Sequence, residues 1–226
     1  MIITIKRWLS YLWDIQVDYR FSDINGDLVV FLSKGRYQLC TANAIYSFED
    51  RYDNFGNIFR DSFDYSLLKG NKVLILGLGL GSVPITLDMV KPRHWDFTAV
   101  EIDDAVCELA ALYGYPKIKS PIDTRVGDAL IFVKTNRESF DLICLDLFID
   151  DIMPEASMEL DFLEDLKSML GPGGVVVANT LAYTEEHKTK SEAFFKDKFL
   201  SVFPDAKLQY THLNNMLISD KNYLFS

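Results

Sequence analysis

From residue 72 onward, short apolar runs alternate with helical patterns, and this alternation constrains the fold of the 226-residue chain more than any other feature. The predicted strands cover 72–77, 96–102, 123–127, 140–146 and 174–180. The predicted helices between them cover 82–91, 103–113, a short segment from residue 128, and 155–170. This order is typical of an α/β protein with a doubly wound, mostly parallel sheet. A further helix over about 185–202 and two late strands, 206–212 and 215–219, predict an antiparallel hairpin at the sheet edge.

The first 71 residues have a different pattern. Residues 15–21 largely alternate between apolar and polar side chains, and an Asn-Gly turn signal and the apolar run 28–32 follow them. This pattern over 14–41 predicts a small antiparallel β unit. In 48–69, aromatic residues at positions 52, 55, 59 and 63 have helical spacing. We therefore divide the chain into a small N-terminal β unit (1–47), a helical linker (48–71) and an α/β domain (72–226).

Charge and composition restrict the partners. The net charge of −10 argues against nucleic acid and anionic lipid as main partners, although solubility alone also accounts for it, and it permits a cationic substrate. No apolar run reaches the ~18 residues that span a bilayer, and the start lacks a signal-peptide pattern. We therefore expect a cytoplasmic protein. The three His and three Cys residues show no metal-ligand spacing, so we expect no metal.

A glycine-rich loop follows the first predicted strand of the α/β domain. Gly77, Gly79 and Gly81 allow positive φ and bring backbone N–H groups close to a ligand, although a tight structural turn has the same composition. Glu101 lies 20 residues beyond Gly81 at the end of the next strand, where a carboxylate can accept both hydroxyls of a ribose. The loop predicts an adenosine-type ligand, with two neighbouring residues, Leu78 and Ile102, as further contacts.

The downstream residues distinguish two ligand classes. "GLGLGS" is a near miss of the dinucleotide motif GxGxxG, whereas S-adenosylmethionine fits the later segments better. Asp128, followed by Ala129, ends the third strand where it can bind an adenine amino group. With the Gly-Pro-Gly-Gly turn and the late hairpin, this order resembles the Rossmann-like fold of class I S-adenosylmethionine-dependent methyltransferases.

Within that fold, residues 28–180 resemble the spermidine synthase family. The resemblance rests on "VLILGLGLGS", "VEID", "GDALIFV", "DLICLD" and "FLEDLKSMLGPGGVVVAN". It implies a nucleoside-binding domain over 72–226 and aminopropyl transfer from decarboxylated S-adenosylmethionine to an amine. It also implies that Asp146 orients and deprotonates the amine and that Tyr52 closes the substrate cleft. Asn43 stands where the family has glutamine.

Several positions depart from that family. Leu80 replaces an aspartate that faces the donor's tail, and Ile149 fills the position of a second acid, with Asp150 beside it. Together with Asn43, these changes remove polar contacts from the donor tail and the acceptor. We therefore expect a retained nucleoside pocket and an altered acceptor pocket.

The acidic stretch 141–155 contains the remaining candidates. Asp146 closes a predicted central strand and is either a site carboxylate or a local hydrogen-bonding residue. Asp150 and Asp151 follow in a loop, where they either bind a substrate cation or are solvated. Tyr52 is either a cleft residue or part of the aromatic stripe.

We predict a transferase that binds S-adenosylmethionine or its decarboxylated form and moves an aminopropyl or methyl group to a small acceptor, such as an amine. The alternatives are a small-molecule methyltransferase and a non-catalytic nucleoside-binding relative of the fold. A homodimer is the assembly that we consider.

Overall fold

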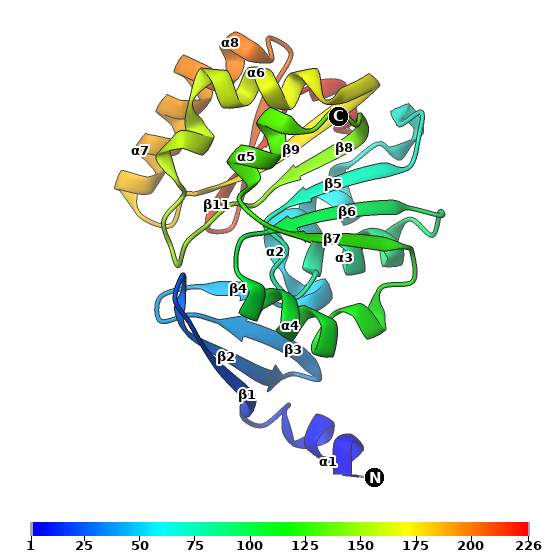
Figure 1. The fold of residues 1–226 in the computed structure, drawn as a ribbon, viewed down its shortest axis with the longest axis vertical. Coiled ribbons are helices and arrows are strands. Elements are labelled where there is room, and N and C mark those ends of the chain that lie inside the picture. Colours follow the sequence, from blue (N-terminus) through cyan, green and yellow to red (C-terminus); the bar gives the residue numbers. More distant parts are fainter. Residues whose placement is uncertain (1, 226) are drawn as a thin grey trace.

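A computed structural model describes residues 2–225 of the chain as a mixed α/β protein (Figure 1). The large sheet consists of β5 (Lys72–Leu76), β6 (Asp96–Glu101), β7 (Ile122–Val126), β8 (Phe140–Leu145), β9 (Leu170–Leu181), β10 (Lys207–Thr211) and β11 (Asn214–Ile218). The strand order is β10-β11-β9-β8-β5-β6-β7, and only the pairs made by β11 are antiparallel. The predicted parallel, doubly wound sheet with a C-terminal antiparallel hairpin is confirmed.

Helices cover both faces of this sheet. One face packs against α5 (Ala129–Thr135), α6 (Leu160–Ser168), α7 (Glu185–Phe194) and α8 (Leu200–Val202) (Figure 1). The other face packs against α2 (Asp53–Asn57), α3 (Ser82–Val90) and α4 (Asp104–Tyr113). Because both faces are covered, the central strands read as continuous apolar runs, which is why they were visible in the sequence.

The chain reverses its direction of winding between β5 and β8, which are neighbours in the sheet. Gly77 follows β5 and Asp146 follows β8, so both lie at this switch point. Gly77 has φ +89°, and a Cβ atom there would lie 2.1 Å from the carbonyl oxygen of Asp146. Only glycine fits this position, and ligands of open α/β sheets bind at such a crevice.

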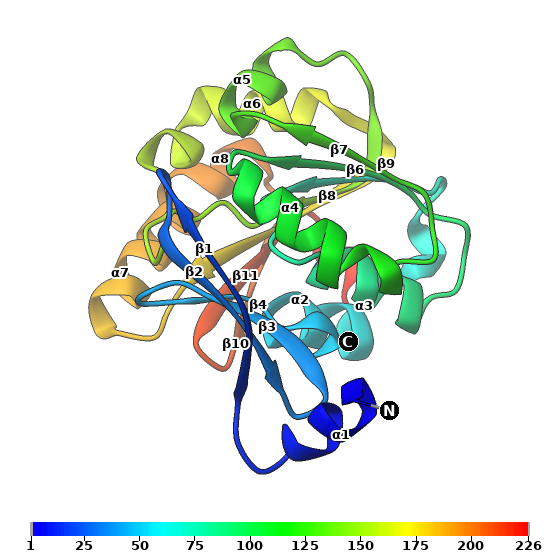
Figure 2. The same ribbon diagram turned by 60° about the horizontal axis from the view of Figure 1, so that its bottom comes forward.

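The N-terminal part of the chain forms a second sheet, which lies below the large sheet in Figure 1 and comes forward in the turned view of Figure 2. Its strands, in the order β1-β2-β3-β4, are β1 (Ile15–Ser22), β2 (Gly26–Ser33), β3 (Arg36–Cys40) and β4 (Ile45–Ser47), and all pairs are antiparallel. This confirms the predicted N-terminal β unit. A helix, α1 (Ile2–Leu9), precedes it and was not predicted. Buried side chains join this sheet to α4 and the glycine loop: Leu28, Val30, Leu39, Leu80, Val106 and Leu109.

Segment 48–71 is helical but irregular. It contains 3-10 turns at Glu49–Arg51 (η1) and Tyr65–Leu67 (η3), the short α2, and a π-helical turn at Ile58–Ser62 (η2). Phe55, Phe59 and Phe63 are fully buried. Phe55 stacks on Phe59 with ring centroids 5.9 Å apart, and Phe59 meets Phe63 edge to face at 5.4 Å. These side chains belong to the core beneath the large sheet, so the segment is packed against the α/β domain. The boundaries at residues 47 and 71 stay a prediction.

Two elements differ from their predicted bounds. The helix predicted over 155–170 is divided into a 3-10 turn (η5, Glu155–Met158) and α6, because Glu159 between them has an extended backbone. Strand β9 begins at Leu170, one residue before the Gly-Pro-Gly-Gly stretch (171–174), and therefore includes the predicted turn. Its register with β8 shifts between the pairs Phe140–Leu170 and Leu142–Val175, so an irregular stretch of strand replaces a turn outside the sheet.

Candidate active site

A cavity of about 880 Å³ lies at the carboxyl ends of the parallel strands. Its walls come from the glycine loop, the segments after β6, β7 and β8, the end of β9, the β10–β11 hairpin and the segment around η1. Eleven of the residues predicted from the sequence line it: Asn43, Tyr52, Gly77, Gly79, Glu101, Ile102, Asp128, Ala129, Asp146, Asp150 and Asp151. The predicted nucleoside and acceptor residues are therefore brought into one space.

Two predicted contacts lie outside the lining, and both belong to the glycine loop. The side chain of Leu78 is buried in the core, and only its backbone N–H points toward Glu101. Gly81 is the N-cap of α3 with φ +85°, and its N–H donates to the carbonyl of Leu78 at 2.9 Å. The loop thus exposes Gly77 and Gly79 to the cavity, while Leu78 and Gly81 fix the turn.

Glu101 closes β6 beside this loop, and its side chain is only 9% exposed. One carboxylate oxygen accepts from the N–H groups of Leu78 at 2.9 Å and Gly79 at 3.4 Å, and the other accepts from that of Asp103 at 3.2 Å. Burial raises the pKa of Glu101, although these backbone donors oppose the rise. Glu101 therefore holds the glycine loop as well as facing the predicted ribose position.

The segment after β7 supplies another wall. Asp128 is the N-cap of α5, and its Oδ1 atom accepts from the N–H of Leu130 at 2.7 Å. Ala129 follows it with a buried side chain, and Ile102 lines the same cavity with 40% of its surface exposed. A carboxylate beside apolar surface is suited to the amino edge and the flat face of an adenine ring.

Asp146 lines the cavity directly after β8, and its carboxylate has a raised pKa. Its Oδ1 atom accepts from Asn179 Nδ2 at 2.8 Å and from the Tyr52 hydroxyl at 3.4 Å. Asn179 Oδ1 in turn accepts from Asn214 Nδ2 at 2.8 Å. Burial raises the pKa of Asp146 to about 6, against the opposing effect of the hydrogen bonds from Asn179 and Tyr52. A carboxylate with this pKa can take up a proton near neutral pH.

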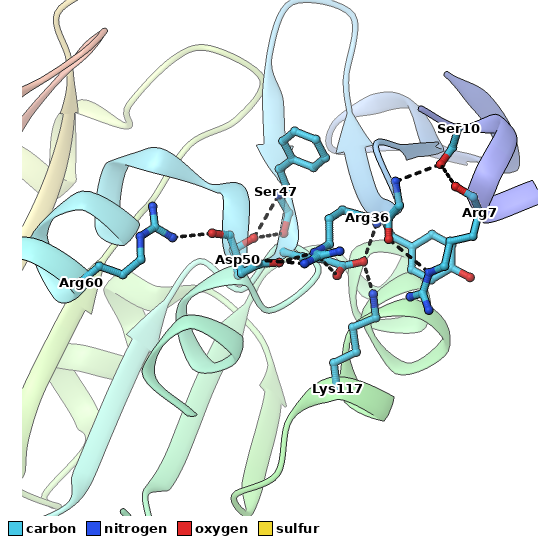
Figure 3. Close-up of polar contacts among 12 residues, drawn as sticks. Arg7, Ser10, Arg36, Ser47, Asp50, Arg60 and Lys117 are labelled. Atoms are coloured by element: carbon cyan, nitrogen blue, oxygen red, sulfur yellow. Dashed lines mark hydrogen bonds and ion pairs between the residues drawn. The ribbon is translucent and has the colours of Figure 1, made fainter. Parts of the chain in front are cut away.

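Tyr52 satisfies both readings of the sequence, because it lines the cavity and also packs against the aromatic core. The preceding turn η1 is held by charged side chains from outside it (Figure 3). Glu49 is buried and pairs with Lys117, and Asp50 pairs with Arg36 at 2.5 Å. Burial, together with the neighbouring Asp146, raises the pKa of Tyr52 well above its ordinary value, so this hydroxyl stays protonated and donates.

The two predicted acceptor residues Asn43 and Asp150 bond to each other. Asp150 accepts from the side chain of Asn43, from its backbone N–H at 3.2 Å and from Thr41 Oγ1 at 2.5 Å. Burial raises the pKa of Asp150, but these donors outweigh it and the pKa lies below its ordinary value. Asp150 thus fastens the loop after β8 to the N-terminal sheet. Asp151 beside it accepts from the Tyr183 hydroxyl at 3.2 Å.

The positions that depart from the spermidine synthase pattern lie in different environments. Leu80 is 1% exposed and packs in the core beneath the N-terminal sheet, so its side chain does not face the cavity. Ile149 lines the cavity and is 40% exposed. The glycine loop therefore offers no carboxylate to a donor's tail, and the acceptor side contains an apolar residue where that pattern has an acid.

Several lining residues were not predicted, and they include Asn179 and Asn214. Their signal in the sequence was weak, because both are amides in otherwise apolar strands. Carboxylates outnumber cationic side chains in the lining, with Asp53, Glu101, Asp128, Asp146, Asp150 and Asp151 facing Lys34 and Arg51. The cavity therefore favours a positively charged ligand. Among residues 2–225, no group of three or more His, Cys, Asp or Glu side chains could hold a metal ion.

Comparison with known proteins identifies the family. Residues 62–219 match the sequence model described as the spermine/spermidine synthase domain. The chain belongs to this family. A polyamine aminopropyltransferase from Vibrio vulnificus (strain CMCP6) is 35% identical over 130 residues, which is 56% of this chain and 43% of that protein. The chain thus matches less than half the length of this relative.

Solved structures share the fold of this spermine/spermidine synthase family member. Spermidine synthase from Thermotoga maritima has a TM-score of 0.69 and 18% identity, and the match covers 92% of this chain and 73% of that one. Human methyltransferase-like protein 13, in complex with SAH, has a TM-score of 0.54 and 24% identity over 68% of this chain and 73% of that one. Both likenesses show the Rossmann-like methyltransferase fold. Within the described residues no helix is long and apolar enough to cross a membrane.

Proposed function

We propose that this protein transfers an aminopropyl group from decarboxylated S-adenosylmethionine to a small amine. The observation that carries the proposal is Asp146, a carboxylate with a pKa of about 6 that lines the cavity beside the glycine loop. The family supports it, because the relative from Vibrio vulnificus is named for the same transfer. Nucleic acid is not a partner in this proposal, and we expect the protein to act in the cytoplasm.

The residues present fit an adenosyl sulfonium compound. The acidic lining suits its positive charge, Asp128 and Ile102 suit an adenine ring, and Glu101 has acceptor capacity left on the oxygen that bonds to Asp103. When bound, the donor supplies an electrophilic carbon and a neutral thioether as leaving group. No metal is needed for this chemistry, because positioning and proton removal suffice.

Asp146 has the central role in the transfer. An amine attacks with its lone pair, the new N–C bond forms as the C–S bond breaks, and the nitrogen must lose one proton. We assign that proton to Asp146, whose Oδ2 atom receives no hydrogen bond from the described residues. Tyr52 and Asn179 bond only to Oδ1, so they fix the carboxylate without occupying its second oxygen. At pH 7 a group with a pKa of about 6 is mostly ionised and ready to accept.

Methyl transfer from S-adenosylmethionine is the second candidate, and Leu80 favours it. Because Leu80 is buried in the N-terminal core, the glycine loop provides no carboxylate for the ammonium tail of a decarboxylated donor. A methyl donor carries a carboxylate on that tail, and Arg51 lines the same cavity. The two candidates share the base and the nucleoside site and differ in the group that moves.

Product analysis separates the candidates. The protein is incubated with each donor and a panel of small amines, and the released nucleoside is identified by mass spectrometry. Aminopropyl transfer releases 5′-methylthioadenosine, and methyl transfer releases S-adenosylhomocysteine. We expect 5′-methylthioadenosine, formed in amounts equal to the alkylated amine. Donor binding without either product across the panel would contradict the proposal and favour a non-catalytic nucleoside-binding protein.

A further inference from the structure

Two buried asparagines stand behind Asp146. Asn179 lies on β9 and is 1% exposed, and Asn214 begins β11 and is 6% exposed. In the antiparallel register Asn179 pairs with Met216, so Asn214 is its diagonal neighbour on the same face of the sheet. The hydrogen bonds from Asn214 Nδ2 to Asn179 Oδ1 and from Asn179 Nδ2 to Asp146 Oδ1 are both 2.8 Å long.

The direction of this chain of hydrogen bonds follows from donor and acceptor chemistry. An ionised carboxylate only accepts, so Asn179 must present its NH₂ group to Asp146. The carbonyl oxygen of Asn179 then needs a donor, and Asn214 supplies one. Because neither amide titrates, the pair orients the carboxylate at every pH without adding charge. Buried amides are costly unless bonded, and both groups of the Asn179 amide have a partner here.

We propose that Asn179 and Asn214 are positioning residues that hold Oδ1 of Asp146 against β9 and leave Oδ2 to face the substrate. The consequence of this positioning for catalysis rests on the proposed function. Asn179 is 2.8 Å from Oδ1, whereas the Tyr52 hydroxyl is 3.4 Å away, so Asn179 makes the shorter of the two contacts. Asn214 acts through Asn179, which it prevents from turning its carbonyl toward the carboxylate.

Other titratable groups also face Asp146. They are Tyr52 before α2, Glu101 at the end of β6 and Cys144 on β8. The variants below leave all three in place. Any change in the titration of Asp146 therefore reports the loss of an amide.

The test measures the titration of Asp146 itself. Protein labelled with ¹³C at aspartate carboxyl carbons is titrated from pH 4 to 8, and the Asp146 resonance is assigned from its absence in Asp146→Asn. In Asn179→Leu the carboxylate loses a donor, so its midpoint should rise by about one unit from the wild-type value near 6. Asn214→Leu should move it in the same direction by less. The double variant should move it no further than Asn179→Leu, because Asn214 acts through Asn179.

The matched control is Asn215→Leu. Asn215 is the next residue on β11, is equally buried at 2% exposure and bonds to Ser191 on the opposite face. Its substitution should leave the Asp146 midpoint unchanged. An unchanged or lower midpoint in Asn179→Leu, or an equal shift in Asn215→Leu, would overturn the proposal.

A second variant tests the same contact if Asn179→Leu does not fold. Asn179→Asp keeps the shape of the side chain and places two carboxyl groups side by side, so one apparent pKa of the pair should rise above the wild-type midpoint. The contact between the two side chains would be contradicted if the Asp146 midpoint stayed at its wild-type value and the introduced carboxyl group had an ordinary midpoint. The titration needs no substrate, so it judges this proposal even if no transfer is found. If transfer is found, the acid limb of kcat/KM in Asn179→Leu should move up by the same amount.

Discussion

Replacing the candidate base should make the protein more stable and less active at the same time. Asp146→Asn keeps an oxygen at Oδ1, so Asn179 and Tyr52 still have their acceptor, and it removes the buried charge. The pKa of Asp146 is about 6 in the folded protein against an ordinary 3.8. Folding therefore disfavours the ionised form by about 3 kcal/mol. The variant avoids this cost.

The stability that Asp146→Asn gains over the wild type should increase with pH. A carboxyl group with a raised folded pKa contributes stability below pH 3.8, and that contribution is lost as the pH rises through about 6. The free energy of unfolding of Asp146→Asn should exceed that of the wild type by up to about 3 kcal/mol at pH 8. The difference should shrink toward zero as the pH falls below 4. Turnover should fall by a factor of about 10²–10⁴, because a positioned base is lost.

Urea unfolding at several pH values measures this difference. Asp151→Asn is the control, because Asp151 lines the same cavity and bonds only to the exposed Tyr183 among the described residues. Its effect on stability should be small at every pH. The reasoning is refuted if Asp146→Asn is less stable than the wild type at pH 8, or if the difference does not change with pH.

Four substitutions test other parts of the cavity. Glu101→Ala should weaken nucleoside binding by about 1.5–3 kcal/mol in calorimetry; it should also lower the melting temperature, because Glu101 holds the glycine loop. Gly77→Ala should cost at least about 1–3 kcal/mol in urea unfolding, since its φ of +89° disfavours a side chain and Cβ meets a carbonyl; an unchanged midpoint would contradict this. Asp150→Asn should loosen the contact with Thr41 and Asn43, and faster proteolysis of the loop after β8 would reveal this. Asp151→Asn should mainly raise the KM of a cationic acceptor, and the increase should be larger at low salt.

Periodicity and glycine placement were sufficient to predict the main sheet. The central strands are buried on both faces, so their apolar runs stand out, and the turns between them contain the glycines that close contacts require. The same logic placed Glu101, Asp128 and Asp146 at strand ends on one edge of the sheet. Helix α1 was missed because it is short, and because Ile5 and Trp8, which are 54% and 79% exposed, do not mark a buried face.

Contacts between distant segments could not be predicted from the sequence. Asn43 and Asp150 are 107 residues apart, and their mutual hydrogen bond depends on how the N-terminal sheet packs. Leu80 was compared with a donor-binding aspartate, but its side chain enters the core that this packing creates. Asn179 became visible only through the register of β8 and β9, which sets it beside Asp146.

Calorimetric titration with four ligands tests the central claim most directly. S-adenosylmethionine, its decarboxylated form, 5′-methylthioadenosine and NAD are titrated separately into the protein under one set of conditions. We expect decarboxylated S-adenosylmethionine to bind tightest, 5′-methylthioadenosine to bind as well, and NAD to bind weakest. Tighter binding of NAD than of all three adenosyl compounds would contradict the assignment of this cavity to a sulfonium donor.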